Sequence, residues 1–423
     1  MRFSSLDQWL SWQEGLHTKE IDLGLDRVRQ VLTLLDLPPR PAHQVITVAG
    51  TNGKGSSCAM LEAIYLAAGY RVGTYTSPHL LRYNERIRFN GEQIDDEQLC
   101  QVFEQIDQAR GDISLSYFEF GTLAAIVAFA QTKLDVAIME VGLGGRLDAV
   151  NVLNADVALI TAISVDHEAW LGRDRNLIGR EKAGIMRAGS SVVCGDIDAP
   201  PSIAEVAAEV GAPLYLQGQQ FGAEKKGEHW RWWSGDKQRD ALLMPALRGD
   251  FQLYNAAAVL QVIDLAAKWL PVSQAAVREG LANVSVPGRF QVIPGPVPIV
   301  LDVAHNPQSA LALSQTLHDW GMPGKTVAIV AMMADKDIDA IVAALAPEID
   351  EWCVTSIDIP RAAPVQLLVD SLERVGATEL TVRSSVEASL EHVMASVKEH
   401  DRVIVFGSFY TVAEVLASNY NIV

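Results

Sequence analysis

The segment Ala49–Ser57, with the sequence A-G-T-N-G-K-G-S-S, constrains this chain more than any other. It follows an apolar run at 45–48 and opens a helical pattern at 58–68. A strand, a glycine-rich turn and a helix start, in that order, direct backbone N–H groups and the positive end of the helix dipole at an anion, and a lysine adds a full charge. The segment therefore predicts a phosphate-binding loop that contains Lys54.

The match to the general P-loop pattern is imperfect at two positions. That pattern requires glycine at position 48 and a hydroxyl residue at position 55, whereas Val48 and Gly55 are present. The hydroxyl comes one residue later, at Ser56, so we do not assign it to a metal ion. A plain glycine turn with a solvated lysine is the competing interpretation, and the strand–turn–helix context favours phosphate binding over it.

Length and composition indicate a globular protein of two or three domains. The 423 residues are 49% hydrophobic and 20% charged, and no apolar run approaches the roughly 18 residues that span a bilayer. The first residues lack a secretory signal pattern, so we expect a cytoplasmic protein without a membrane partner. Four cysteines that form no C-x-x-C pair fit buried thiols in a reducing compartment.

The formal net charge of −18 argues against a nucleic-acid partner. Anionic ligands such as nucleotide phosphates would therefore have to be attracted by local cations rather than by the charge of the whole chain. The candidates are Lys54, Arg82, Arg86 and Arg289.

Alternating helical and strand patterns indicate an α/β domain in the first two thirds of the chain. Helical patterns are expected at 6–12, 25–35, 118–131, 173–186 and 255–267, and strands at 71–75, 134–139, 157–163 and 191–194, with a hairpin turn at Asn90-Gly91. Taken alone, Asp22 is predicted to cap the second helix. Residues 214–245 are expected to form antiparallel strands, with the tryptophans of Trp230–Trp233 packed on an edge strand.

Polar residues recur where the predicted strands end. The glycine-rich loop follows the first strand, Ser77 the second, Glu140 the third and His167 the fourth. The carboxyl ends of strands in an open parallel sheet line one edge, where ligands bind. A single glutamate after a strand is usually a solvated loop residue, but four such strand ends together predict a binding site.

The alternation of strand and helix patterns begins again after a proline- and glycine-rich stretch. We predict a first domain at 1–286, a linker at 287–296 and a second α/β domain at 297–423. Its strands are expected at 299–302, 326–332, 352–357, 379–382 and 402–406. No G-x-G-x-x-G fingerprint follows the first of them, so a dinucleotide site is not expected; Asp302–Pro307 stands there instead. The expected fold is an N-terminal P-loop-type ATPase domain with a mostly parallel sheet plus a smaller C-terminal Rossmann-like domain.

The polar groups at the strand ends suit an ATP–magnesium site. Lys54 would face the phosphates, and Mg²⁺ takes a few protein oxygens while keeping phosphate or water in the rest of its shell. Histidine is a less usual ligand of Mg²⁺, which favours a second, mixed metal position at His167. Composition alone leaves Lys182 as a lysine on a helix surface.

Several motifs together resemble the bacterial bifunctional dihydrofolate synthase/folylpolyglutamate synthase family, within the Mur ligase superfamily. The resemblance runs nearly end to end, and no motif position departs from it. It rests on the segments Leu16–Leu25, Ala49–Ser56, Thr76–Leu80, Tyr117–Glu119, Glu140–Asp148, Asp166-His167, Glu181–Gly184, Pro287–Phe290, Asp302–Pro307 and Phe406–Ser408. In that family, too, the hydroxyl residue comes one position later than in the general P-loop pattern, as Ser56 does here.

This resemblance implies a role for each candidate residue. Nucleotide contacts would come from Thr51, Asn52, Gly53, Lys54, Asn255, Arg289 and Asp302, across the interdomain cleft. Ser77, Glu140 and His167 would hold two magnesium ions, and Lys182 would be carbamylated. The pterin site would be formed by Asp22, Leu23, Gly24, Leu25, Ser116, Tyr117, Phe118, Glu119, Leu147, Asp148 and Ala149. His305 would act with Lys54 and Lys182 in catalysis, near the transferred phosphate and the incoming glutamate.

The implied enzyme is a monomeric, ATP-dependent ligase with small-molecule partners. It would join L-glutamate to dihydropteroate and to reduced folates through an acyl phosphate. Two other readings stay open at this point: a Mur-type ligase that adds an amino acid to a cell-wall precursor, and a non-catalytic nucleotide sensor. The segments at 22–25 and Phe118-Glu119 favour a pterin over a cell-wall precursor.

Overall fold

The computed structural model describes residues 1–19, 21–38 and 40–418, which divide into two compact units. The N-terminal unit comprises Met1–Ala246 with Leu253–Val284, and the C-terminal unit comprises Leu247–Gln252 with the chain from Ser285 onward. Each unit is built on its own β-sheet. None of the described helices is long and apolar enough to cross a membrane.

An eight-stranded sheet with the order β4-β3-β2-β5-β1-β6-β7-β8 forms the centre of the N-terminal unit. Its parallel strands are β1 (Gln44–Ala49), β2 (Val72–Tyr75), β5 (Val136–Glu140), β6 (Val157–Ile160), β7 (Ser191–Cys194) and β8 (Leu214–Leu216). The hairpin of β3 (Ile87–Phe89) and β4 (Glu92–Gln93) adds an antiparallel edge. The strands β2, β5 and β6 are buried along their whole length, and β1 and β7 at all but their first residue, because helices cover both faces of the sheet.

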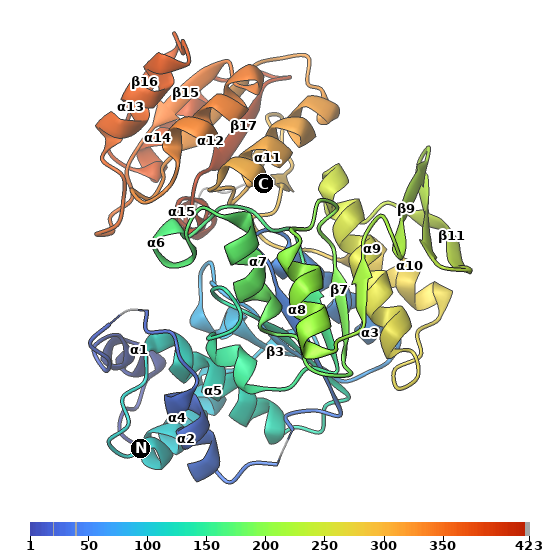
Figure 1. Ribbon diagram of the computed structural model, residues 1–423. Coiled ribbons are helices and arrows are strands. Elements are labelled where there is room, and N and C mark those ends of the chain that lie inside the picture. Colours follow the sequence, from blue (N-terminus) through green and yellow to red (C-terminus); the bar gives the residue numbers. More distant parts are fainter. Residues whose placement is uncertain (20, 39, 419–423) are drawn as a thin grey trace. The chain divides into compact units, whose positions relative to one another are not determined.

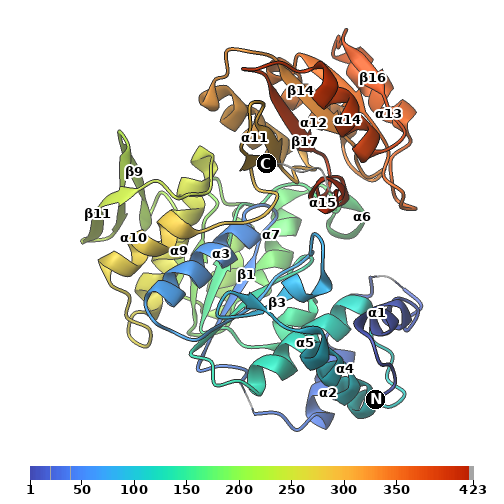
Figure 2. The ribbon, with the colours of Figure 1, turned by 180° about the vertical axis from the view of Figure 1, so that it is seen from behind.

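The two faces of this sheet carry different helices. Figure 1 shows α7 (Arg175–Ala183) and α8 (Ser202–Val210) in front of the sheet, and Figure 2, from behind, shows α3 (Lys54–Ala67) and α10 (Gln274–Asn283) with α9 (Asp250–Ala266) beside them. A separate group of helices packs together near β2 and completes the core. Its members are α1 (Leu6–Glu14), α2 (Asp26–Leu34), α4 (Asp96–Arg110) and α5 (Tyr117–Ala130). The short helices of the unit are η1 (Tyr83–Arg86), η2 (Ala149–Val152) and α6 (Glu168–Leu171).

Two expectations for residues 214–245 are wrong. Leu214–Leu216 was expected to be antiparallel, but as β8 it pairs parallel with β7 because it completes another strand–helix–strand unit through α8. The tryptophans lie on β10 (His229–Ser234), which is the central strand between β9 (Phe221–Lys226) and β11 (Lys237–Leu243), rather than on an edge. Trp230 and Trp232 are each 1% exposed, so their side chains are part of the hydrophobic core.

A six-stranded sheet with the order β12-β13-β17-β14-β15-β16 forms the C-terminal unit. The strands are β12 (Gln291–Ile293), β13 (Ile299–Leu301), β14 (Thr326–Val330), β15 (Glu351–Val354), β16 (Leu380–Val382) and β17 (Arg402–Phe406). All pair in parallel except β12, which lies within the segment expected to be a linker and pairs antiparallel with β13. Its helices are α11 (Pro307–Trp320), α12 (Ile338–Leu345), η3 (Ala346–Glu348), α13 (Val365–Arg374), α14 (Val386–Ser396) and α15 (Phe409–Ala417). The two sheets confirm the expected α/β fold class.

The contact between α10 and α3 yields a test of the packing behind the phosphate loop. A Cβ on Gly280 of α10 would lie 2.6 Å from the Cα of Ile64 and 2.7 Å from its backbone nitrogen in α3. Gly280→Ala gains up to about 1 kcal/mol of helix propensity, but overlap with backbone cannot be relieved by a rotamer change and costs on the order of 1–3 kcal/mol. We expect a lower melting temperature by calorimetry.

Gly15→Ala is the matched control. Gly15 has φ −95°, and an added Cβ there would meet one atom, the Trp12 carbonyl oxygen, at 3.8 Å. This variant should melt like the parent. A Gly280→Ala protein that melts as high as the parent would contradict the packing described here.

Candidate active site

The sheet brings the sequence-predicted residues into one row. Strands β2, β5, β1 and β6 are consecutive neighbours, although they are not consecutive in the chain. Ser77 follows β2, Glu140 ends β5, Gly50–Lys54 follows β1, and His167 follows β6. The carboxyl ends of these parallel strands therefore place a hydroxyl, a carboxylate, a glycine-rich loop and an imidazole along one edge of the sheet.

Gly53 and Asn255 lie in direct contact at the start of α3. Gly53 has φ +90°, a left-handed conformation that favours glycine, and its built Cβ would lie 2.6 Å from Asn255 Oδ1. Asn255, on α9, is 8% exposed. The structure thus joins two of the predicted nucleotide residues that are about 200 positions apart in the sequence.

Hydrogen bonds to the segment after β6 hold the rest of the loop. The N–H of Thr51 donates to Ala162 O at 2.8 Å, and that of Asn52 donates to the same oxygen at 3.3 Å. The Thr51 hydroxyl donates to Ser164 O at 2.9 Å. These contacts fix the loop before the helix begins, so phosphate binding would fall mainly to the first turn of α3 and to Lys54.

Lys54 folds back onto its own loop. Its Nζ donates to Gly50 O at 3.0 Å and to Thr51 O at 3.1 Å. Both acceptors are neutral carbonyl oxygens, whereas a phosphate oxygen would accept a stronger, charge-assisted hydrogen bond. The ammonium is therefore held at the loop by contacts that an anionic ligand can replace.

The predicted metal ligands Ser77 and Glu140 provide few oxygen atoms, but of the kind that Mg²⁺ prefers. The backbone N–H of Ser77 donates to Glu140 Oε2 at 3.1 Å, and the Glu140 side chain is buried. Within residues 1–19, 21–38 and 40–418, no group of three or more His, Cys, Asp or Glu side chains could hold an ion by itself. One buried carboxylate and one hydroxyl beside the glycine-rich loop fit Mg²⁺, which completes its shell with phosphate and water oxygens.

His167 adopts an unusual backbone conformation for a side chain of its kind. Its φ is +53°, in the left-handed region, and its N–H donates to Asp166 Oδ1 at 2.8 Å. It caps the short helix α6 without a side-chain hydrogen bond to the helix. A non-glycine residue with positive φ is strained and occurs more often at functional sites than elsewhere.

Lys182, on α7, is 3% exposed, so the interpretation of this residue as a surface lysine is wrong. Burial, and next the charge of Lys54, lower the pKa of its amine to about 7, while Asp166 and Asp148 act in the opposite direction. Lys182 therefore lies within electrostatic range of the phosphate loop and of two predicted site segments. A substantial fraction of its amine is neutral at pH 7.

Asp148 shapes the loop that carries it. Its Oδ2 accepts from the N–H groups of Gly142 at 3.0 Å and Leu143 at 2.9 Å, and its Oδ1 accepts from Val150 at 2.9 Å. Burial raises the pKa of this carboxyl to about 6, although these hydrogen bonds oppose the change. Any contact with a ligand would be made in addition to this backbone role.

Arg27 joins two of the three segments predicted for the pterin. Its Nη1 donates to Asp22 Oδ2 at 2.6 Å, and its Nε donates to Glu119 Oε1 at 3.1 Å. The prediction that Asp22 caps a helix is wrong, because Leu25 is the N-cap of α2 and Asp22 instead accepts from His17, Lys19 and Arg27. Sequence reasoning missed Arg27; its position in the first turn after an acidic loop was the available signal.

The third pterin segment meets the first through the backbone. Gly24 N–H donates to Leu147 O at 3.1 Å, and Ala149 opens η2. Ser116 and Glu119 form a capping box at the start of α5. Tyr117 and Phe118, the two residues between them, are partly buried. A Cβ on Gly142 would lie 2.6 Å from the Phe118 ring. The structure thus brings all three segments, including Leu23 and Leu25 of the first, into one neighbourhood.

A second cluster lies in the C-terminal unit, where Asp302 follows β13. Its carboxyl oxygens accept from the N–H groups of Phe290 and Ala304, each at 2.8 Å. Burial raises the pKa of Asp302, and Arg289 opposes that change. The Arg289 guanidinium and the His305 ring lie 5.1 Å and 6.1 Å from the Phe409 ring centre. Phe409, which sequence reasoning missed, therefore packs against two of the three predicted residues.

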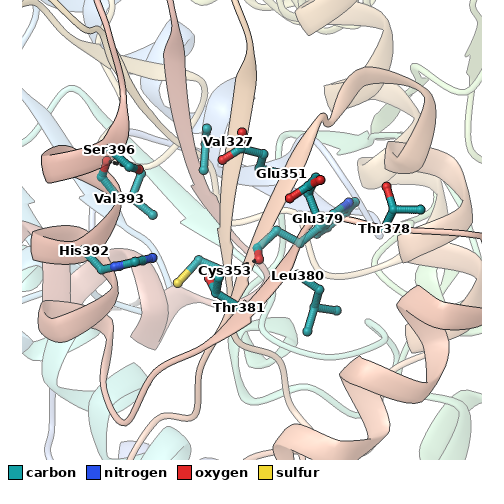
Figure 3. A pocket seen from close by; sticks show the side chains of 11 residues that line it. Val327, Glu351, Cys353, Thr378, Glu379, Leu380, Thr381, His392, Val393 and Ser396 are labelled. Atoms are coloured by element: carbon teal, nitrogen blue, oxygen red, sulfur yellow. Dashed lines mark hydrogen bonds between the residues drawn. The ribbon is translucent and has the colours of Figure 1, made fainter.

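A cavity in the C-terminal unit is separate from this cluster. It has a volume of about 130 Å³ and lies between α14 and the amino ends of β15 and β16, as Figure 3 shows. Its polar lining includes Glu351, Glu379 and His392. Asp302 and His305 follow the carboxyl end of β13 in the same parallel sheet, so this cavity opens at the opposite edge. It is also small for a nucleotide or a folate.

Two family models match successive parts of the chain. The model of the Mur ligase middle domain matches residues 48–263, and that of the Mur ligase glutamate ligase domain matches residues 288–409. The dihydrofolate synthase/folylpolyglutamate synthase of Escherichia coli is 43% identical over 413 residues, which cover 98% of this chain and 95% of that protein. The Haemophilus influenzae protein of the same name is 40% identical, with 97% of each chain covered.

The solved structures that resemble this chain belong to enzymes of the same family. The Escherichia coli enzyme in complex with DHPP and ADP superimposes with a TM-score of 0.93 at 43% identity, covering 98% of this chain and 97% of that one. The Yersinia pestis enzyme complexed with AMPPNP and a manganese ion gives a TM-score of 0.92 at 47% identity, with 98% of both chains covered. The chain therefore belongs to the bifunctional dihydrofolate synthase/folylpolyglutamate synthase family of the Mur ligases.

Proposed function

We propose that this protein is an ATP-dependent ligase that joins L-glutamate to dihydropteroate, giving dihydrofolate, and to reduced folates, extending their glutamate tail. One observation carries this proposal most directly. The lysine-bearing loop after β1 and the buried Glu140 of β5 lie at one sheet edge, and the loop that follows β5 belongs to a group of three segments. Arg27 joins the first two of these segments, and the hydrogen bond from Gly24 N–H to Leu147 O joins the first to the third. A phosphate site beside an organic-acceptor site is what phosphorylation of a carboxylate requires.

The residue roles in this proposal are those that the family resemblance implies. ATP would be bound by Thr51, Asn52, Gly53, Lys54 and Asn255, with Arg289 and Asp302 from the C-terminal unit. Ser77, Glu140 and His167 would hold two magnesium ions, which neutralise phosphate charge when bound. The pterin would lie against residues 22–25, 116–119 and 147–149.

The chemistry has two steps. A carboxylate oxygen of the acceptor attacks the γ-phosphorus of ATP, the bond to the ADP oxygen breaks, and an acyl phosphate forms. The amine of glutamate then attacks the acyl carbon, the C–O bond to phosphate breaks, and the amine loses a proton. Lys54 would stabilise the charge that spreads over the transferring phosphoryl group, because a positioned cation acts most strongly on the transition state.

His305 is suited to the second step. Its Nδ1 lies 2.8 Å from Val303 O, and a carbonyl oxygen can only accept, so Nδ1 carries the proton. In the neutral ring Nε2 then holds the lone pair. A group of this kind can take the proton that the glutamate amine releases.

Lys182 would act as a carbamate. The ammonium first loses one proton to solvent. The neutral amine then attacks the carbon of CO₂, an N–C bond forms as one C=O π bond opens to a carboxylate oxygen, and a second proton is released, so that a cation has become an anion. The depressed pKa supplies the neutral amine, and the nearby charge of Lys54 attracts the product. Asp166 and Asp148 disfavour that negative charge, so a cation bound at Glu140 and His167 would strengthen the modification.

Ligation of glutamate tests the proposed function. Purified protein with ATP, Mg²⁺ and L-glutamate should release phosphate and form a new amide when either dihydropteroate or tetrahydrofolate is added. A protein that uses neither acceptor, but joins an amino acid to a cell-wall precursor, would overturn the proposal in favour of the other Mur ligase activity.

The pKa of Lys182 predicts a specific dependence of stability on pH in CO₂-free, metal-free buffer. Below about pH 7 both folded and unfolded chains carry the ammonium, and its burial costs on the order of 4–5 kcal/mol, since a pKa lowered from 10.5 to about 7 is worth about 1.4 kcal/mol per tenfold change in proton affinity. Between pH 7 and 10.5 the folded state releases the proton first, so this cost falls as pH rises.

Lys182→Met should therefore be more stable than the parent at pH 6, and the difference should shrink towards pH 10. Denaturant unfolding at a series of pH values measures it. The exposed Lys133 gives the control, because Lys133→Met should follow the parent at every pH. A stability difference that does not change with pH would show that the Lys182 amine titrates normally.

Incubation with ¹³C-bicarbonate tests the carbamate. A carbamate carbon resonance should appear in the parent and be absent from Lys182→Ala, and activity should fall when CO₂ is removed and return when it is restored. Full activity of a metal-loaded enzyme whose Lys182 remains a free amine would contradict the modification.

A further inference from the structure

Arg86, at the end of η1, is a buried cation that the proposed mechanism does not use. The residue is 9% exposed, and its guanidinium carbon lies 5.1 Å and 5.6 Å from the ring centres of Tyr83 and Tyr117. Its Nε donates to Nδ1 of His79 at 2.9 Å. Two aromatic faces and one imidazole hold the plane of the guanidinium in place.

No carboxylate of residues 1–19, 21–38 and 40–418 forms an ion pair with this guanidinium. The contacts of Arg86 are the histidine and the two tyrosine rings, and its terminal nitrogens Nη1 and Nη2 make no hydrogen bond to a described residue. The neighbouring Glu85 is already engaged, because its carboxylate accepts from the N–H groups of Leu80, Leu81 and Arg82, each at 2.7 Å. A buried charge without a partner is costly, which suggests that an anionic ligand supplies one.

The backbone places Arg86 beside one predicted metal residue and one pterin segment. Thr76 N–H donates to Arg86 O at 2.9 Å, and Thr76 directly precedes Ser77, whose N–H contacts Glu140. The hydroxyl of Tyr75 is within electrostatic range of both Arg86 and Asp148. Tyr117, against which the guanidinium stacks, belongs to the second pterin segment. Arg86 thus lies between the metal residues and the pterin segments.

The sheet order argues against an ATP phosphate as its partner. Arg86 leads directly into β3, and two strands, β2 and β5, separate β3 from β1 and its phosphate loop. Neighbouring strands lie about 4.8 Å apart, so roughly 14 Å separate the two positions along the sheet. The anion is therefore expected on the acceptor substrate rather than on the nucleotide.

The two proposed acceptors differ in the anions that they carry. The single carboxylate of dihydropteroate is the one that reacts. A reduced folate reacts at the γ-carboxylate of its terminal glutamate and retains an α-carboxylate beside it. A cation on the acceptor side of the glycine-rich loop can bind that second carboxylate through the fork of its terminal nitrogens.

We propose that Arg86 binds the unreacted α-carboxylate of the glutamate tail of reduced folates, and so serves the chain-extending reaction but not the first one. This inference rests on the proposed function. It makes Arg86 a specificity residue that selects between the two acceptors of a shared site.

The first test uses the parent enzyme and needs no variant to fold. Tetrahydrofolate is compared with its α-amide, in which the α-carboxylate is a neutral carboxamide and the γ-carboxylate is intact. We expect kcat/KM for the α-amide to be about 10- to 100-fold lower, the range for losing a charged hydrogen-bonded pair. Equal use of both compounds would overturn the assignment.

The second test is Arg86→Gln, assayed with both acceptors. kcat/KM should fall about 10- to 100-fold with tetrahydrofolate and by less than about 3-fold with dihydropteroate, while the KM values for ATP and glutamate stay unchanged. The variant should also lose the parent's preference for tetrahydrofolate over the α-amide. Arg71→Gln is the matched control, because Arg71 precedes the amino end of β2, is half exposed and pairs with Asp135.

The outcomes separate this inference from the proposed function. If the parent uses neither acceptor, the function itself fails. If the parent uses both and Arg86→Gln reduces both equally, Arg86 binds the reacting carboxylate or supports the fold, and the inference fails. An effect confined to the KM for glutamate would assign Arg86 to the incoming amino acid and overturn it as well.

Discussion

The parallel pairing of β1 with β5 and β6 is the constraint on which the N-terminal unit depends. Val48 is the register partner of Glu140 on one side and of Leu159 on the other, so these three strands reach the same sheet edge together. Parallel strands require crossover connections, and here the helices that supply them also cover the sheet. The same pairing therefore builds the core and lines up polar groups from segments up to about 120 residues apart.

Burial then sets the chemistry of the groups at that edge. Asp148 and Lys182 are both nearly inaccessible to water, and burial raises the pKa of the acid to about 6 and lowers that of the amine to about 7. Desolvation thus brings two groups with very different intrinsic affinities for a proton close to neutral pH. The hydrogen bonds that Asp148 accepts from backbone N–H groups keep its loop in shape in spite of this cost.

Much of the fold, and the candidate residues at the strand ends, could be predicted from the sequence because the relevant signals are local, whereas the candidate roles of Asn255, Lys182 and the pterin segments came from the resemblance to a family. The apolar run before Ala49–Ser57 and the polar residue after each strand are visible in a short window. Side-chain partners across long separations are not visible in this way: Arg27 reaches Glu119 over 92 positions, and the pKa of Lys182 depends on the charges of Lys54 and Asp166. The wrong expectations for β8 and for the tryptophan strand have the same origin, since strand pairing is decided by neighbours distant in sequence. The expectation for Asp22 failed for a local reason, because its carboxylate accepts from His17, Lys19 and Arg27 and α2 begins after Leu25.

Arg27 also couples the evolution of three positions, which are Asp22, Glu119 and Arg27 itself. It donates to the carboxylates of Asp22 and Glu119 at once, so losing either one removes one of its two carboxylate partners, and losing the arginine leaves two acidic groups near each other without it. Residues that share a hydrogen-bond network show non-additive effects when they change. Natural drift at any one of the three positions is therefore constrained by the other two, and descendants of this chain should retain or replace them as a set.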